Sequence, residues 1–197
     1  ELDDSAPLWE GGDLSGQTFF LRAEQGYGDT IQTIRYAPIL AEMGATVKVG
    51  CPPALARLFS DAPHVSEVIT GNAGRVNFNN HQALFSLPRI LGTTLDNIPG
   101  TVPYLTAPSQ DGIELPATKG VFRIGLTWHG SGSHNPDRRS VPFEQLLPLL
   151  EQEHTMFFSL QLGDAAHDPA RADAENKLAD LSPLMDDFAS TAALIEQ

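Results

Sequence analysis

QTFFLRAEQGYGDT, at residues 17–30, is the stretch of the chain that decides the predicted fold. Its residues 18–21 form a continuous run of β-branched, aromatic and aliphatic side chains, which is typical of a strand covered on both faces. Gly26 and Gly28 then permit a tight turn and a close approach of the backbone to a ligand. Asp29 and Thr30 are good helix N-caps, and an apolar helical spacing follows them. The stretch therefore predicts a strand, a glycine turn and a helix.

The turn in this stretch is the first candidate site. In an open α/β sheet, ligands bind in the crevice at the carboxyl ends of the strands. We therefore expect substrate-binding residues directly after the strand, namely Glu24, Gln25, Gly26, Gly28 and Thr30. Asp29 has two interpretations: it is only a helix N-cap, which spacing alone favours, or it is a general base that takes a proton from a hydroxyl group. Glu24 is the alternative base.

The remainder of the chain repeats the alternation of strands and helices. The first part predicts a parallel sheet of right-handed βαβ units, with strands at residues 46–49, 65–69 and 83–87, helices at 30–43 and 54–59, a polar turn at 77–81 and a helical turn at 87–91. Pro38 should interrupt the first helix, and Gly44 should end it. The second part predicts strands at 121–128 and 155–160, helices at 142–152 and 188–195, and an acidic segment with helical stretches at 163–187.

Prolines scattered between residues 99 and 120 separate these two parts. The predicted organisation is a Rossmann-like domain at residues 1–107, a linker at 108–119 and the first part of a second Rossmann-like domain at 120–197. The chain begins without a methionine or a basic leader and stops within a predicted helix, so we expect it to be a piece of something longer.

Composition narrows the classes of partner. The chain has 12 basic and 25 acidic residues and a net charge of −13, which argues against a nucleic acid or an anionic membrane as partner but not against a small anionic ligand. No apolar run approaches the length of a transmembrane segment. The single cysteine, Cys51, excludes an internal disulfide and fits a reducing compartment, so a cytoplasmic location is expected.

A second candidate site is the segment WHGSGSHNPDRRS at residues 128–140. A turn of small residues after a strand offers backbone N–H groups to a phosphate, and two adjacent arginines add bidentate donors. An equally weighted alternative is a solvated loop in which Arg139 pairs with Asp137. Gln161, at the end of the next strand, would point into the same crevice, or it is simply a polar residue that ends the strand. The spacing of His129 and His134 does not support a metal site.

The glycine turn also invites comparison with a dinucleotide-binding site. The third glycine position of that fingerprint holds Ile31, and Gly50 and Cys51 stand where an acidic residue would bind the ribose. These two departures argue against an NAD site, and no cofactor is expected.

Short segments along nearly the whole chain resemble, in order, the glycosyltransferase region of bacterial tetratricopeptide-repeat proteins. This family is related to the ADP-heptose:lipopolysaccharide heptosyltransferases of glycosyltransferase family 9 and more distantly to O-GlcNAc transferase. The matching segments are PLW (7–9), LSGQT (14–18), EQGYGDT (24–30), RY (35–36), SLP (86–88), GTT (92–94), IP (98–99), PYL (103–105), GLTWHG (125–130), DRRS (137–140), SLQ (159–161) and TAA (191–193).

The resemblance implies a GT-B fold, in which two Rossmann-like domains face each other across a cleft. It implies inverting, metal-independent transfer of a sugar from a nucleotide-diphosphate sugar to a glycan, a lipid-linked or a protein acceptor. Asp29 would be the base. The donor diphosphate would be bound by residues of the second part of the chain: Trp128, His129, Gly130, Arg138, Arg139, Ser140 and Gln161.

Two expected parts of the family are absent from this sequence: a later donor-binding segment and upstream tetratricopeptide repeats. We therefore expect little or no transferase activity from this chain alone. The alternatives are a non-catalytic module that binds carbohydrate or protein, and a nucleotide-sugar epimerase, which would form product without an acceptor.

Overall fold

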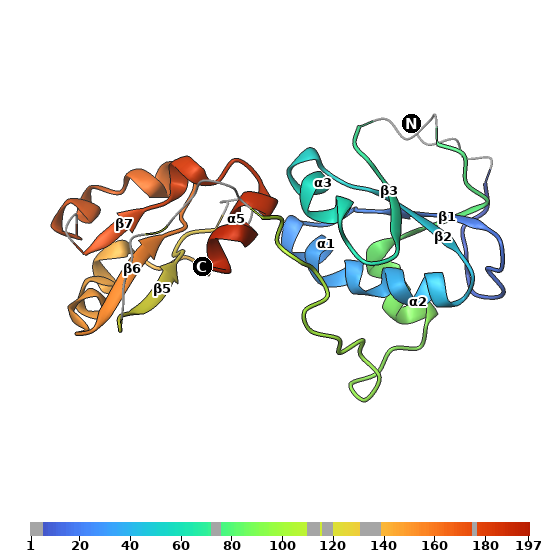
Figure 1. Cartoon of the computed structure of the whole chain (residues 1–197), viewed down its shortest axis with the longest axis horizontal. Coiled ribbons are helices and arrows are strands. Elements are labelled where there is room, and N and C mark those ends of the chain that lie inside the picture. Colours follow the sequence, from blue (N-terminus) through green and yellow to red (C-terminus); the bar gives the residue numbers. More distant parts are fainter. Residues whose placement is uncertain (1–5, 72–75, 110–114, 116–119, 131–138, 175–176) are drawn as a thin grey trace. The chain divides into compact units, whose positions relative to one another are not determined.

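The computed structural model describes residues 6–71, 76–109, 115, 120–130, 139–174 and 177–197. The chain divides into two compact units, residues 1–108 with 187–192 and residues 109–186 with 193–197 (Figure 1). Each unit contains a parallel β-sheet, of four strands in the first and three in the second. The predicted α/β class with parallel sheets is therefore confirmed, and it is consistent with a Rossmann-like fold. The two units are described separately below.

The sheet of the first unit is built around β1 (Thr18–Arg22). Its strand order is β3-β2-β1-β4, with β2 at Thr46–Gly50, β3 at Val65–Ile69 and β4 at Asn80–Ala83. The chain winds outward from β1 through β2 to β3 and then returns to place β4 on the other side of β1. The direction of winding therefore reverses between β1 and β4, and such a reversal is where open α/β sheets bind ligands.

Alternation along β1 divides its side chains between two environments. Phe19 and Leu21 are fully buried in a hydrophobic cluster that also contains residues of α2 (Ala37–Glu42), α3 (Pro53–Ser60) and α4 (Leu87–Ile90). Phe20 lies outside that cluster and stacks on Phe78, with ring centroids 5.1 Å apart. A strand whose side chains are buried on both sides explains the continuous apolar run in the sequence.

The helical segment after β1 differs from its prediction at its start. It begins at Tyr27 as α1 (Tyr27–Thr33), with Gly26 as the N-cap, so the prediction that Asp29 or Thr30 caps it is wrong. The tight turn brings the chain into helical geometry before either side chain could serve as a cap. A 3-10 turn (Ile34–Tyr36) then leads into α2, where Pro38 occupies the first turn, a position that needs no N–H donor. The predicted interruption and the end at Gly44, with φ of 94°, are confirmed.

The fourth strand is displaced from its prediction. The strand is β4, and the segment expected at 83–87 instead forms a 3-10 turn at Leu84–Ser86 followed by α4. The prediction failed because His81 and Gln82 are polar yet buried. Gln82 Nε2 donates to the backbone oxygen of Trp9 at 3.0 Å, and the short N-terminal segment pairs with β4 through a bridge between Leu8 and His81.

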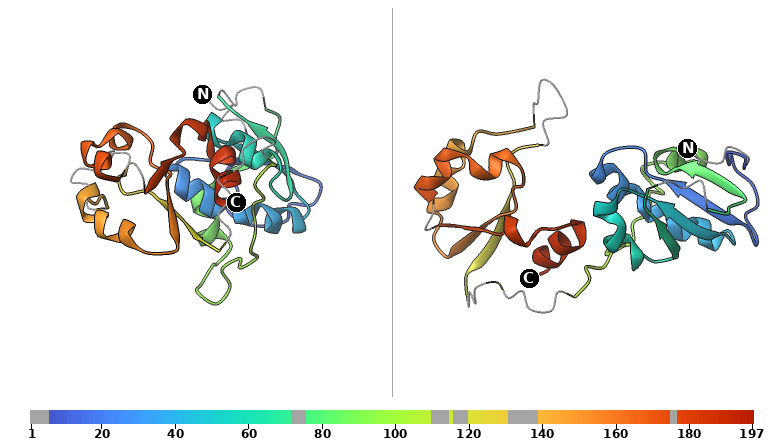
Figure 2. Two further views of the ribbon diagram at one scale, coloured as in Figure 1. Left: turned by 60° about the vertical axis from the view of Figure 1, so that its left-hand side comes forward. Right: turned by 90° about the horizontal axis from the view of Figure 1, so that it is seen from above.

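Residues 91–108 follow α4 as a long loop without helix or strand (Figure 2). Arg35 anchors this loop, because its Nη1 donates to the backbone oxygen of Pro99 at 3.2 Å and its guanidinium lies 4.3 Å from the centre of the Tyr104 ring. Tyr36 adds a hydrogen bond from its hydroxyl group to Thr93 Oγ1 at 3.0 Å.

The second unit contains β5 (Phe122–Leu126), β6 (Thr155–Ser159) and β7 (Leu178–Asp180), in that order. The predicted helix at 142–152 is instead two 3-10 segments, Phe143–Gln145 and Leu147–Glu151, because prolines precede and divide it. The acidic segment holds 3-10 turns at Asp164–His167, Pro169–Ala174 and Ser182–Leu184 rather than α-helices. It also supplies β7, which is too short and too polar to be recognised in the sequence.

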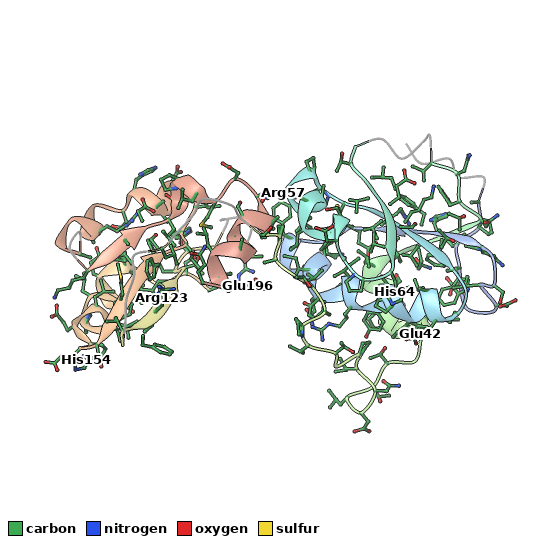
Figure 3. All side chains as sticks on the ribbon, in the orientation of Figure 1. Glu42, Arg57, His64, Arg123, His154 and Glu196 are labelled. Atoms are coloured by element: carbon green, nitrogen blue, oxygen red, sulfur yellow. The ribbon has the colours of Figure 1, made fainter. Side chains whose placement is uncertain are left out.

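Two histidines to which the sequence assigned no role occupy equivalent places in the two units. His64 and His154 have positive φ angles, 64° and 58°, and each stands directly before a strand, β3 or β6 (Figure 3). Histidine is one of the side chains that enter this left-handed region more readily than most. Their structural role is therefore to turn the chain into the next strand.

The predicted helix at the end of the chain is α5 (Phe188–Ile195). Asp187 and Ser190 form a reciprocal cap, in which each side chain accepts a hydrogen bond from the backbone N–H of the other residue, at 2.7 and 3.0 Å. Arg57 of α3 donates two hydrogen bonds to the Asp187 carboxylate at 2.8 and 2.7 Å (Figure 3). The hydrogen bonds from Arg57, helped by those from Ser190, lower the pKa of Asp187 to about 2.

This lowered pKa predicts a pH-dependent contribution to stability. Because the carboxylate is favoured in the folded state, its contribution is complete above the ordinary pKa of 3.8 and is lost as the pH falls through about 2. We expect Asp187→Asn to lower the free energy of unfolding by about 1 kcal/mol at neutral pH, and this difference should shrink below pH 3.8. Urea titrations across this range test it, with exposed Asp96→Asn as the control. A difference that does not change with pH would contradict the assignment.

A second prediction concerns the packing between β1 and β2. A Cβ atom on Gly50 would lie 2.6 Å from Cζ of Phe20, whose ring is buried and held against Phe78. We therefore expect Gly50→Ala to lower the free energy of unfolding by about 1–3 kcal/mol. Gly100→Ala is the matched control, because its Cβ would meet only a backbone oxygen at 3.7 Å. Thermal and urea unfolding should show no loss for the control, and equal stability of both variants would refute the prediction.

Candidate functional site

The first candidate site lies at the carboxyl edge of the first sheet. The chain leaves β1 through Ala23, whose N–H donates to the Gly50 oxygen at 2.9 Å, and turns into α1 at Tyr27. Residues 24–29 are thereby held at the end of β1, beside the reversal between β1 and β4. The 3-10 turn after β4 contacts α1, so segments that follow both strands meet at this edge.

Asp29 is the third residue of α1 and is half-buried. Its Oδ2 lies 3.3 Å from the position that a Cβ atom on Gly26 would occupy, so the carboxylate folds back across the glycine turn. Among the residues that the structure describes, none donates a hydrogen bond to this carboxylate or forms an ion pair with it. The group is therefore able to accept a proton from a ligand at this edge.

The other predicted substrate-binding residues differ in exposure. Glu24, Gln25, Gly26 and Gly28 are exposed in the turn and its first helical residues. Thr30 is buried, and its Oγ1 donates to the Gly26 oxygen at 3.0 Å. Its side chain therefore holds the turn in shape. Substrate binding by these residues stays a prediction.

Sequence reasoning missed three side chains at this edge. Arg22 ends β1, and two aromatic rings, Tyr27 and Phe85, are 48% and 50% exposed. Tyr27 contacts Phe188, with ring centroids 4.9 Å apart, and Phe85 lies in the turn after β4. Arg22 directly follows the strand predicted at 18–21, and this position would have identified it, whereas Phe85 lies inside the strand predicted at 83–87 and gave no such signal.

The second candidate site lies at the carboxyl edge of the second sheet and is organised by Gln161. This residue is only 4% exposed. Its Oε1 accepts hydrogen bonds from Thr127 Oγ1 at 3.1 Å and from the backbone N–H groups of Trp128 and His129 at 3.0 and 2.9 Å. Its Nε2 donates to the backbone oxygens of His129 and Leu162. Gln161 thus fixes the segment after β5 to the end of β6.

Hydrogen bonds join the described residues on either side of 131–138. The Gly130 N–H donates to Ser140 Oγ at 2.9 Å, and the Val141 N–H donates to the Trp128 oxygen at 2.9 Å. The N–H groups of residues 128–130 are therefore all engaged within the chain, whereas most of the small-residue turn that predicts a phosphate cradle lies outside the described residues. His129 and Arg139 are exposed, whereas Arg138 and residues 131–137 lie outside the described part of the chain.

Trp128 belongs to the core of the second unit. It is 5% exposed and packs on Phe143, with ring centroids 4.8 Å apart, and the Arg171 guanidinium lies 5.7 Å from its ring centre. A direct contact of the indole with a diphosphate would require the core to open. The structure therefore gives Trp128 a supporting role, and ligand contact in this region stays a prediction for His129 and Arg139.

Hollows are found among the described residues of the second unit. One of about 340 Å³ lies at the carboxyl edge, between the segments after β6 and β7, and is lined by Leu162, Asp164, His167 and Ser182 among others. Another of about 610 Å³ lies at the amino ends of the strands, lined by residues such as Val121, Thr155 and Leu178. Since ligands of parallel sheets bind at carboxyl ends, the smaller hollow is the relevant one. The sequence assigned His167 no role.

Metal and thiol chemistry receive no support from the described residues. No cluster of three or more histidine, cysteine or carboxylate residues suited to a metal ion occurs among them. Burial raises the pKa of the Cys51 thiol to about 11, so it is protonated at neutral pH and is a poor nucleophile. None of the helices in the described part of the chain has the length and apolar character of a membrane span.

Comparison with models of known protein families, with curated proteins and with solved structures found no significant match to this chain.

The hydrogen bonds of Gln161 predict a large effect of its removal. Gln161→Ala would leave three buried or half-buried donors and two backbone oxygens without partners, so we expect a loss of about 2–3 kcal/mol in the free energy of unfolding. Gln152→Ala, at an exposed position, is the control. Urea unfolding, with hydrogen exchange at Trp128 and His129 as a local readout, measures the effect. Unchanged protection at these two amides would overturn the assigned role.

Proposed function

We propose that this chain is the glycosyltransferase part of a GT-B enzyme, which transfers a sugar from a nucleotide-diphosphate sugar to a hydroxyl acceptor with inversion and without a metal. The observation that carries the proposal is the position of Asp29. Its half-buried carboxylate stands at the carboxyl edge of a parallel sheet, at the reversal of winding, without a bonding partner among the described residues. The presence of two α/β units with parallel sheets supports the GT-B architecture.

The chemistry of such a transfer needs one base on the acceptor side. Asp29 accepts the proton of the acceptor hydroxyl while that oxygen forms a bond to the anomeric carbon. The bond from this carbon to the donor diphosphate breaks at the same time, and the diphosphate leaves with the electron pair. A carboxylate that forms no hydrogen bond within the described chain retains its lone pairs for this proton.

The donor side of the proposal rests on the second unit. Charge on the leaving diphosphate requires cationic or N–H donors, and exposed Arg139 is the described residue best suited to it. The hollow lined in part by His167 and Ser182 provides space at the carboxyl edge of the same sheet. Gln161 and Ser140 act in this proposal by holding the loop that follows β5.

Because little or no transfer is expected from this chain alone, the test is made in a longer protein that joins the chain to a donor-binding segment. It compares Asp29→Asn with Glu24→Gln and with Asp96→Asn, an exposed aspartate in the loop after α4. Binding is measured first, by calorimetric titration of UDP-glucose, UDP-N-acetylglucosamine, GDP-mannose and ADP-glucose. Transfer of radiolabelled sugar to a glycan array and to a serine-rich peptide is measured next. We expect Asp29→Asn to lower the transfer rate on the order of 10²–10⁴-fold with little change in nucleotide-sugar binding, and the other variants to stay active.

The competing functions give different results in the same assays. If Glu24→Gln loses activity and Asp29→Asn does not, the base is Glu24. If product forms without an acceptor, the protein is an epimerase. If no nucleotide sugar binds or reacts but the glycan array retains the protein, it is a carbohydrate-binding module and the transferase proposal is rejected.

A further inference from the structure

We propose that Arg22 is the centre of an oxyanion-binding site at the carboxyl edge of the first sheet, for an organic ligand that carries a phosphate or a carboxylate group. The site lies within the first unit, and its argument does not depend on the transferase proposal.

Arg22 lies at the carboxyl end of a strand that has neighbours on both sides. It is the last residue of β1 and is aligned with Gly50 of β2 on one side and Ala83 of β4 on the other. It therefore stands at the reversal of winding between β1 and β4. Neither aligned neighbour has a side chain larger than a methyl group.

The guanidinium of Arg22 has no partner among the described residues. Arg22 is half-buried, and its Nε is fully buried without a hydrogen bond. Within the part of the chain that the structure describes, its guanidinium makes no hydrogen bond, ion pair or ring contact. Glu24 and Asp29, the acidic residues closest to it in sequence, form no ion pair with it.

Other basic side chains of the chain show how unusual this is. Arg57 pairs with Asp187, Arg89 with Glu10, Arg171 with Asp180, Lys48 with Glu67 and Lys177 with Glu151. Acidic residues outnumber basic ones by 25 to 12, so carboxylates are abundant. Arg22 therefore lacks a partner although carboxylates are abundant. It is also one of the few basic residues at the edge where α/β sheets bind ligands.

The chemistry of the guanidinium indicates the class of ligand. Withdrawing a charged group from water without a partner costs free energy, and an incoming anion would recover it. The planar guanidinium fits the two oxygens of a carboxylate or phosphate, with paired, charge-assisted hydrogen bonds. Phe85, half-exposed two residues beyond the Ala83 neighbour, offers apolar surface to the remainder of the ligand. These features together favour an organic oxyanion over an inorganic ion.

The test measures binding to the whole chain by calorimetric titration at low ionic strength. The probes are inorganic phosphate, pyrophosphate, UDP, glucose 6-phosphate and glucuronate, with glucose as the neutral control. The variants are Arg22→Gln, which removes the charge, Arg22→Lys, which keeps the charge but loses the planar fork, and Arg89→Gln, a matched control at an exposed arginine. We expect at least one organic oxyanion to bind the unmodified chain, about tenfold or more weaker binding by Arg22→Gln, an intermediate loss in Arg22→Lys and no change in Arg89→Gln.

The probes also separate the possible sources of the oxyanion. Preference for UDP or pyrophosphate assigns Arg22 to a nucleotide, whereas preference for glucose 6-phosphate or glucuronate assigns it to an anionic sugar. Both outcomes support the site. Failure of every oxyanion to bind the unmodified chain, or equal binding by Arg22→Gln, would overturn it.

A second readout distinguishes a binding residue from a structural one. In Tris-chloride buffer, Arg22→Gln should melt at the same temperature as the unmodified chain or higher, because it removes a half-buried charge that no described residue balances. Addition of the best oxyanion should raise the melting temperature of the unmodified chain but not that of the variant. A lower melting temperature of Arg22→Gln in chloride buffer would show that Arg22 is structural and would reject the proposal.

Discussion

The position of β1 between two parallel partners is the constraint on which the first unit depends. Its hydrogen bonds to β2 and β4 align Arg22 with Gly50 and Ala83 and end all three strands at one edge. Phe19 and Leu21 fix one side of the strand in the core, and Phe20 fills the space that Gly50 leaves open on the other. Because Phe19, Phe20 and Leu21 are committed to packing, the first charged side chain of the strand is Arg22, where the strand stops.

The two units use their carboxyl edges differently. In the first, the carboxylate of Asp29 and the guanidinium of Arg22 both lack partners among the described residues, so charge is available to a ligand. In the second, both the oxygen and the nitrogen of the Gln161 amide form hydrogen bonds with the backbone after β5, and Ser140 Oγ accepts one from the Gly130 N–H. A buried amide that is fully hydrogen-bonded stabilises a shape, whereas a charge without a partner favours binding. Arg22 and Asp29 therefore make the carboxyl edge of the first sheet a candidate site for a charged ligand.

Much of the fold could be predicted because its strongest signals are local. The apolar run of β1, the glycine at the end of α2 and the spacing of α3 and α5 depend on neighbours in sequence and were recognised correctly. The start of α1 was misplaced because the chain becomes helical at Tyr27, directly after Gly26 and before the residues that make good caps. β4 escaped recognition because its polar residues are buried by partners far away in the chain, such as Trp9 for Gln82, which no local pattern reveals, and β7 because it is only 3 residues long.

The sequence by itself determined that this is an acidic α/β protein with two similar parts, and it placed a candidate base directly after the first strand. It could do so because strand and turn composition reflects short-range sterics and the burial of apolar side chains. Only the tertiary structure decided what each polar side chain does. Gln161 and Thr30 form hydrogen bonds with backbone groups, and Trp128 packs in the core. Arg22 forms no hydrogen bond or ion pair among the described residues. The physical reason is that hydrogen-bond and charge partners come from distant segments, and their presence or absence is fixed only when the strands assemble.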